Sequence, residues 1–136
     1  MDAIQTIQSM LAPAMMISSC GLLFLGLQNR YGRIVDRLRQ FNREKEDSPS
    51  ENLKVLEIQI RQLALRGKLQ RNALSCLLFA VIFFICTSFL ILISIKLAIV
   101  SFLIGMVSVL SGVVFAWVEL ITSYRTVMME TENETA

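Results

Sequence analysis

A dense group of charged side chains follows the first apolar stretch of the chain, and it is the place where chemistry could be expected. Its members are arginines with one aspartate among them: Arg30, Arg33, Asp36, Arg37, Arg39 and Arg66. Clustered guanidinium groups beside a membrane suit anions, so Arg33, Asp36, Arg37 and Arg39 could form a pocket for a lipid headgroup or phosphate. Alternatively, Asp36 pairs with Arg33 or Arg66 and the other arginines form a solvated basic surface. This second interpretation is the simpler expectation.

Nothing in the sequence indicates catalytic residues. The chain has no histidine, no Gly-rich phosphate loop, no acid pair flanking a cleft and no Ser, His, Asp set. Cys20, Cys76 and Cys86 lie in apolar segments without a Cys-x-x-Cys pair, which predicts inert thiols rather than disulfides or a zinc site. We therefore expect no enzymatic activity, no catalytic residue, no metal and no cofactor.

Small and polar residues recur at helical spacing in the last apolar segment. They share one predicted helix face: Ser101, Gly105, Ser108, Gly112, Ala116, Glu119 and Ser123. Small residues let helix backbones approach closely in lipid, so we expect a packing seam within or between subunits rather than a pore lining. Glu119 would be costly toward lipid and should meet a cation or water. Arg30, Arg33 or Arg125 could neutralise it.

The first apolar segment carries a comparable stripe. It includes Gln5, Gln8 and Ser19, with Ala12, Met15, Gly26 and Asn29 at helical spacing between and after them. Such side chains could hydrogen-bond a neighbouring helix or line a water-filled path, and packing is the safer expectation. Two such faces in one small protein favour self-assembly.

Three segments are apolar enough to position these residues across a membrane, and hydrophobic residues make up 54% of the chain. We predict transmembrane helices at about 4–28, 73–95 and 97–121, the first with a kink at Pro13. A single helix through the last two would be about 70 Å long, so the chain must reverse near Ser94, Ile95 and Lys96. The rival interpretation of the first segment, a signal cleaved before Cys20, lacks a positive n-region, and the residues after Cys20 stay apolar.

A helical hairpin is predicted at about 29–72, between the first two spans. After a polar break at Glu44 to Asp47, an N-cap pattern at Ser48-Pro49-Ser50-Glu51 should begin its second helix. Apolar positions on the two helices predict antiparallel pairing: Ile34, Leu38 and Phe41 on the first, and Leu53, Leu56, Ile60 and Leu63 on the second. Val55, Ile58, Leu65 and Leu69 widen the apolar surface, so we expect another copy of the hairpin to cover it.

Basic residues predict the orientation. The segment from Gln28 to Asn72 and the residues after the last span, at 122–136, hold all of the Lys and Arg except Lys96. This bias places the hairpin and C-terminus in the cytoplasm and the N-terminus outside, and it reflects topology rather than nucleic-acid binding. Tyr31, Trp117 and Tyr124 would then lie at the headgroup layer.

The run Asn29-Arg30-Tyr31-Gly32-Arg33-Ile34-Val35-Asp36-Arg37-Leu38-Arg39, with Pro13-Ala14 before it and Arg66 and two spans after it, is similar to a known pattern. It resembles a family of small bacterial three-helix membrane proteins catalogued as a domain of unknown function. The resemblance covers nearly the whole chain and implies a bacterial inner-membrane location without an assigned activity.

The sequence thus predicts an all-α integral membrane protein that is not an enzyme. We expect it to self-assemble through its small-residue faces and to present a basic hairpin to lipid, including anionic headgroups, or to a protein partner. The alternative is a homo-oligomeric ion channel whose pore is lined by the polar face of the first or third helix.

Overall fold

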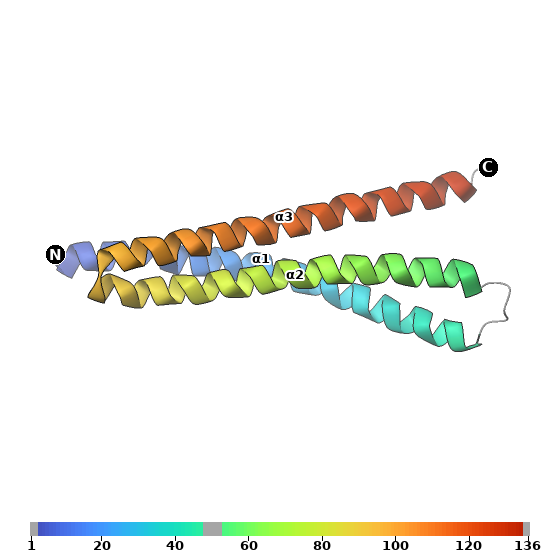
Figure 1. Cartoon of the computed structure of the whole chain (residues 1–136), viewed down its shortest axis with the longest axis horizontal. Coiled ribbons are helices and arrows are strands. Elements are labelled where there is room, and N and C mark those ends of the chain that lie inside the picture. The colour runs from blue at the N-terminus through green and yellow to red at the C-terminus, as the bar shows by residue number, and fades with distance from the viewer. Residues whose placement is uncertain (1–2, 48–52, 135–136) are drawn as a thin grey trace.

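The computed structural model describes residues 3–47 and 53–134, and these fold into three long helices (Figure 1). They are α1 (Ala3–Asp47), α2 (Leu53–Ile93) and α3 (Ile95–Glu134), and no strand occurs in these ranges. Each helix contains a window long and apolar enough to cross a membrane, with mean hydropathy of 1.9, 3.0 and 2.5 in chain order. The prediction of an all-α protein with three helices long and apolar enough to span a membrane is confirmed for the described residues.

Helix α2 is the centre of the structure. It packs along both α1 and α3, which barely touch each other. The innermost cluster lies at the end of the bundle where α2 turns into α3, and Cys20 from α1 meets Ala80 and Phe84 from α2 there. The Phe84 and Phe102 rings complete it, with centroids 5.5 Å apart. The packing of α1 and α3 against α2 thus buries the apolar core.

The chain reverses between α2 and α3 at Ser94, within the segment predicted for the turn. The Ser94 amide donates to the Leu90 carbonyl at 2.8 Å, and the Ser94 carbonyl accepts from the Ala98 amide at 3.1 Å. One residue therefore ends one helix and begins the next, which leaves few backbone groups without partners in an apolar setting.

Helix α1 is longer than expected, because it continues through Glu44–Asp47, where we predicted a polar break. Glu, Lys and Arg are good helix formers, so a polar stretch does not by itself end a helix. The helix also continues through Pro13. The N-cap pattern at Ser48 to Glu51 lies outside the described residues.

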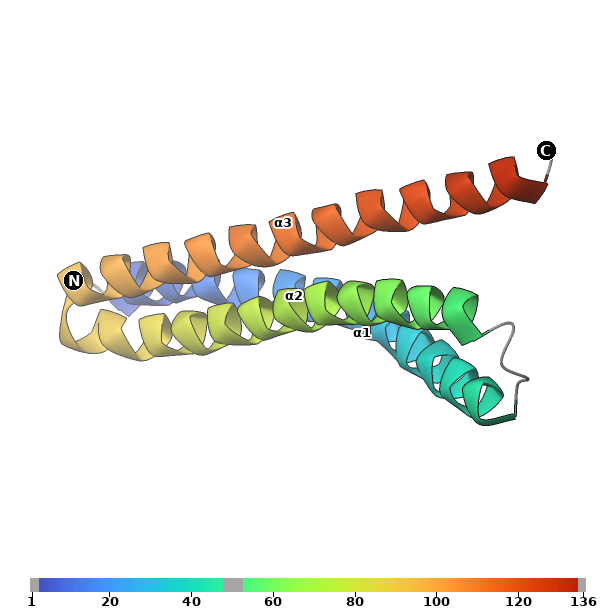
Figure 2. The ribbon, with the colours of Figure 1, turned by 45° about the vertical axis from the view of Figure 1, so that its right-hand side comes forward.

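The second half of α1 and the first half of α2 form the predicted hairpin, which we call the basic hairpin (residues 29–47 and 53–72). Ile34 and Leu63 are buried in it, and a Cβ built on Gly67 would lie 3.5 Å from the Ile34 methyl group. Near its tip, Lys45 Nζ lies 3.4 Å from Glu57 Oε1. Figure 2 shows that the C-terminal half of α3 diverges from this hairpin. In the region of the basic hairpin, α1 and α2 therefore pack against each other while the C-terminal half of α3 moves away from them.

Candidate functional site

The small-residue face of α3 lies against α2 of the same chain. A Cβ added at Gly105 would come within 2.8 Å of the Phe84 ring, and one at Gly112 within 3.2 Å of the Ala73 carbonyl oxygen. A side chain at Gly105 would have to displace the Phe84 ring, and one at Gly112 would press on the α2 backbone. The face is therefore filled within one subunit and lines no open path there.

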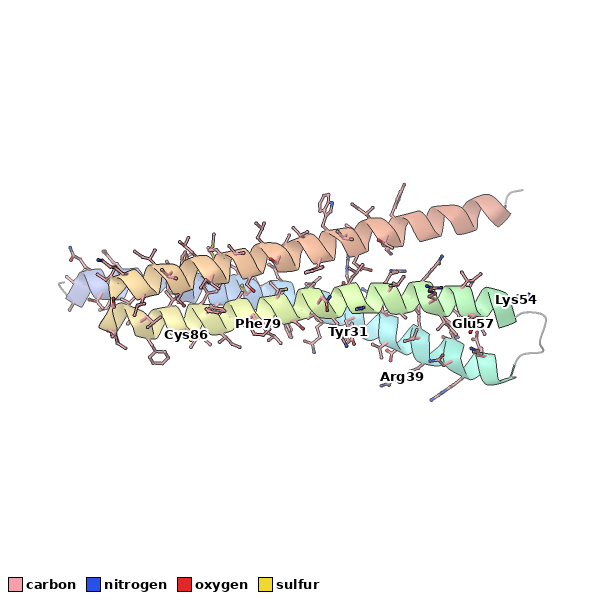
Figure 3. The ribbon with its side chains drawn as sticks, in the orientation of Figure 1. Tyr31, Arg39, Lys54, Glu57, Phe79 and Cys86 are labelled. Carbon is pink, nitrogen blue, oxygen red and sulfur yellow. The ribbon has the colours of Figure 1, made fainter. Side chains whose placement is uncertain are left out.

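Two serines on this face tie α3 to α2. Ser101 Oγ donates to the Phe83 carbonyl at 3.0 Å, and Ser108 Oγ donates to the Cys76 carbonyl at 2.8 Å. In a segment without water, a hydroxyl must find a protein acceptor, and these two find it on the neighbouring helix. The opposite edge of α2, marked by Phe79 and Cys86 in Figure 3, is exposed and suits lipid.

The stripe on α1 remains uncovered. Gln5, Gln8 and Ser19 are exposed, and the Ser19 hydroxyl bonds to the Met15 carbonyl of its own helix at 3.0 Å. The structure thus separates the two predicted stripes, since only the one on α3 contacts another helix of the chain.

Glu119 ends the α3 face, and its partner is Arg66. Arg66 Nε and Nη2 both lie 3.4 Å from Glu119 Oε1, and Nη2 also donates to Ser123 Oγ at 2.6 Å. The side chains of Arg66 and Glu119 are only 19% and 4% exposed. The expectation that Arg30 or Arg33 could neutralise Glu119 was wrong, because Arg66 forms the ion pair. The side chain of Arg125, the third candidate, is not among those that the structure describes.

A cavity of about 320 Å³ opens beside this ion pair, between the diverging helices. We call it the arginine cavity, and its lining comes from all three helices: Arg30, Arg33, Ile34, Arg37, Leu63, Arg66, Glu119, Leu120 and Ser123. Four guanidinium groups and one carboxylate give it a net charge of +3. Arg30, Arg33 and Arg37 recur at spacings of three and four, which places them on one face of α1.

The remaining members of the predicted charge cluster lie elsewhere. Asp36 and Arg39 are exposed and line a separate hollow formed by α1 alone. Neither forms an ion pair with a described residue, so the expected pairing of Asp36 with Arg33 or Arg66 is not formed. The predicted charge cluster is therefore divided, and Glu119 rather than Asp36 is the acidic partner of Arg66.

Gln70 is a buried polar residue that the sequence analysis did not single out. Its Nε2 donates to the Leu27 carbonyl at 3.0 Å and so links α2 to α1. Its Oε1 is buried without a hydrogen-bond partner among the described residues. The only signal in the sequence is its position one helical turn after Arg66, which placed it on the same face of α2.

The arrangement suits the binding of an anion. The arginine cavity offers four guanidinium groups and one hydroxyl, a set of donors suited to holding an anion, and Glu119 is the only acidic residue in its lining. Cys20, Cys76 and Cys86 are free thiols away from this cavity.

Comparison with known families assigns the chain. Residues 10–129 match the family described as protein of unknown function (DUF2721), so the chain belongs to that family. Searches of curated proteins and of solved structures give no match.

Proposed function

We propose that this member of the family is a non-enzymatic protein of the bacterial inner membrane that self-assembles and presents its basic hairpin in the cytoplasm. The orientation follows from the basic residues, since all but Lys96 lie on the side of the hairpin and the C-terminus. The N-terminus would then be outside.

The basic hairpin is suited to meeting anionic surfaces. Of the eleven Lys and Arg between Gln28 and Asn72, Arg66 alone is not exposed. Beyond residue 28, α1 extends for about 28 Å, whereas charges are screened over about 8 Å at physiological ionic strength. Residues near the membrane therefore attract anionic lipid, and those near the tip, such as Arg39 and Arg43, are available to an acidic partner.

An apolar pair on the hairpin carries the proposal of self-assembly. Ile58 and Leu65 are 60% and 56% exposed on α2, in the part of the helix that the sequence predicts to lie in the cytoplasm. They are seven residues apart and so lie on one face of the helix. Exposed apolar side chains in water favour a further contact, and a second copy of the same hairpin supplies a matching surface.

Measuring the mass of the protein in lipid nanodiscs tests this proposal. Ile58→Gln with Leu65→Gln should reduce the oligomer to monomers, because the apolar contact is lost. Gln62→Ala is the matched control, since Gln62 is exposed between the two on the same helix face. A monomer in the unmodified protein, or an oligomer unaffected by the double substitution, would contradict it.

The channel alternative finds less support. The polar face of α3 contacts α2 within the chain, which leaves only the exposed stripe of α1 to surround a pore. A pore would then depend on Gln5 and Gln8 near the outer end and on Ser19, whose hydroxyl is already bonded to its own helix. Ion flux into liposomes that responds to Gln8→Leu would reverse this preference.

A further inference from the structure

We propose that the arginine cavity binds a phosphate group, either from an anionic lipid or as the free anion. The proposal concerns the base of the hairpin and does not depend on Ile58, Leu65 or the tip. It assigns a ligand to residues that come from three different helices.

Charge is the first argument. Glu119 is the only acidic side chain in the lining, and it is already paired with Arg66. Arg30, Arg33 and Arg37 form no ion pair with a residue whose side chain the structure describes. Three like charges along one face of a helix repel one another, and an anion between them removes that repulsion.

The types of donor favour phosphate. Guanidinium groups present paired N–H donors in a planar fork that matches the oxygens of phosphate. Ser123 Oγ accepts from Arg66, which leaves the hydroxyl hydrogen to donate to a ligand oxygen. The volume of about 320 Å³ lies at the lower end of ligand sites, so it suits a headgroup rather than a nucleotide.

The position of the cavity favours a ligand at headgroup depth. On α3, Trp117 and Tyr124 flank the cavity residues and are 64% and 66% exposed, as expected of aromatic rings at the membrane interface. Ile34, Leu63 and Leu120 form the apolar part of the lining. A phosphate with an attached glycerol group would thus meet both charged and apolar side chains in this lining.

The ion pair in the lining can yield to a ligand. Both Arg66 nitrogens lie 3.4 Å from the same Glu119 oxygen, which is longer than the 2.7–2.9 Å of a strong charge-assisted bond. Glu119 is therefore a weak internal competitor for Arg66. Removing its charge should tighten the binding of an external anion, whereas a purely structural role predicts no gain.

The experiment uses the full chain in nanodiscs of phosphatidylcholine, with the unfolding midpoint followed by Trp117 fluorescence. One arm adds phosphatidylglycerol to the bilayer, and the other adds inorganic phosphate against chloride at equal ionic strength. Stabilisation in the first arm identifies a lipid ligand, and stabilisation by phosphate alone identifies the free anion. No stabilisation in either arm overturns the proposal.

Three substitutions then locate the effect. Arg33→Gln and Arg37→Gln should each weaken the apparent affinity about tenfold, the effect of losing one hydrogen-bonded charge. Arg33 and Arg37 are exposed and make no ion pair with a described residue, so both variants should fold. Glu119→Gln should tighten binding several-fold.

Arg39→Gln is the matched control, because Arg39 is an exposed arginine of the same helix outside the cavity. Equal losses in Arg39→Gln and Arg33→Gln would indicate general surface charge and overturn the site. Weaker binding in a folded Glu119→Gln protein would also overturn it. An oligomer lost on changing Ile58 and Leu65, with anion binding retained, would show that the two proposals stand separately.

Discussion

Arg66 on α2 and Glu119 on α3 form a part-buried ion pair in the lining of the arginine cavity, with Nε 3.4 Å from Oε1. The pair and the bond from Arg66 to Ser123 are the polar links between these helices at that level. These contacts therefore hold α2 and α3 together at the arginine cavity.

Removing one partner of this pair should destabilise the protein. Arg66→Met leaves the Glu119 carboxylate buried without its hydrogen-bonded partner, at a cost of about 3 kcal/mol. Replacing both residues by Met should recover much of this loss, because no buried charge remains. Thermal unfolding in detergent micelles, followed by circular dichroism, measures both. The exposed pair of Lys45 and Glu57 is the comparison, and Glu57→Gln should cost less than about 1 kcal/mol.

Gly105 should not tolerate even alanine. The new Cβ would lie 2.8 Å from Phe84 Cε1, so the ring must shift within the innermost cluster, and we expect a loss of about 1–3 kcal/mol. A smaller side chain in Phe84→Leu should reduce the penalty of Gly105→Ala in the double variant. Gly21→Ala is the control, because a Cβ there meets nothing within 4 Å and alanine favours the helix. Equal behaviour of the two alanine variants would contradict the close packing of α2 and α3.

The topology can be tested with single cysteines after Cys20, Cys76 and Cys86 are replaced by alanine. Gln5→Cys should react with a membrane-impermeant maleimide in intact cells, since the positive-inside bias places the N-terminus outside. Gln40→Cys should react only after permeabilisation. Both positions are exposed in the structure, so access to the side chain does not limit either reaction. The reverse pattern of labelling would invert the orientation and place the basic hairpin outside.

The sequence predicted those features that depend on local pattern. Uncharged runs marked the membrane spans, and their combined length required the reversal that occurs at Ser94. The spacing of Gly105 and Gly112 placed them on one helix face, which the structure sets against α2. Periodicity and length act within one element, so they can be read without knowing its neighbours.

The features that the sequence did not predict depend on the register between helices. Arg66 and Glu119 are 53 positions apart, and their pairing follows from where the reversal at Ser94 places α3 along α2. Several arginines near the membrane carry the same charge, so charge alone could not identify which of them pairs with Glu119. Gln70 was overlooked for the same reason, since its burial depends on α1 lying over it.

Gln70 offers a test in which removing a polar group should not weaken the protein. The side chain is fully buried, and its single hydrogen bond to the Leu27 carbonyl contributes about 1 kcal/mol. Its Oε1 has no partner among the described residues, and such a buried acceptor costs about 1–3 kcal/mol. Gln70→Met keeps the length and removes both effects, so the unfolding midpoint in micelles should stay the same or rise. Gln70→Glu should lower it, because the carboxylate cannot donate to Leu27. Gln62→Met, at an exposed position of α2, controls for the methionine itself. A Met variant less stable than the parent by more than the single bond would show that Oε1 has a partner in the membrane-embedded protein.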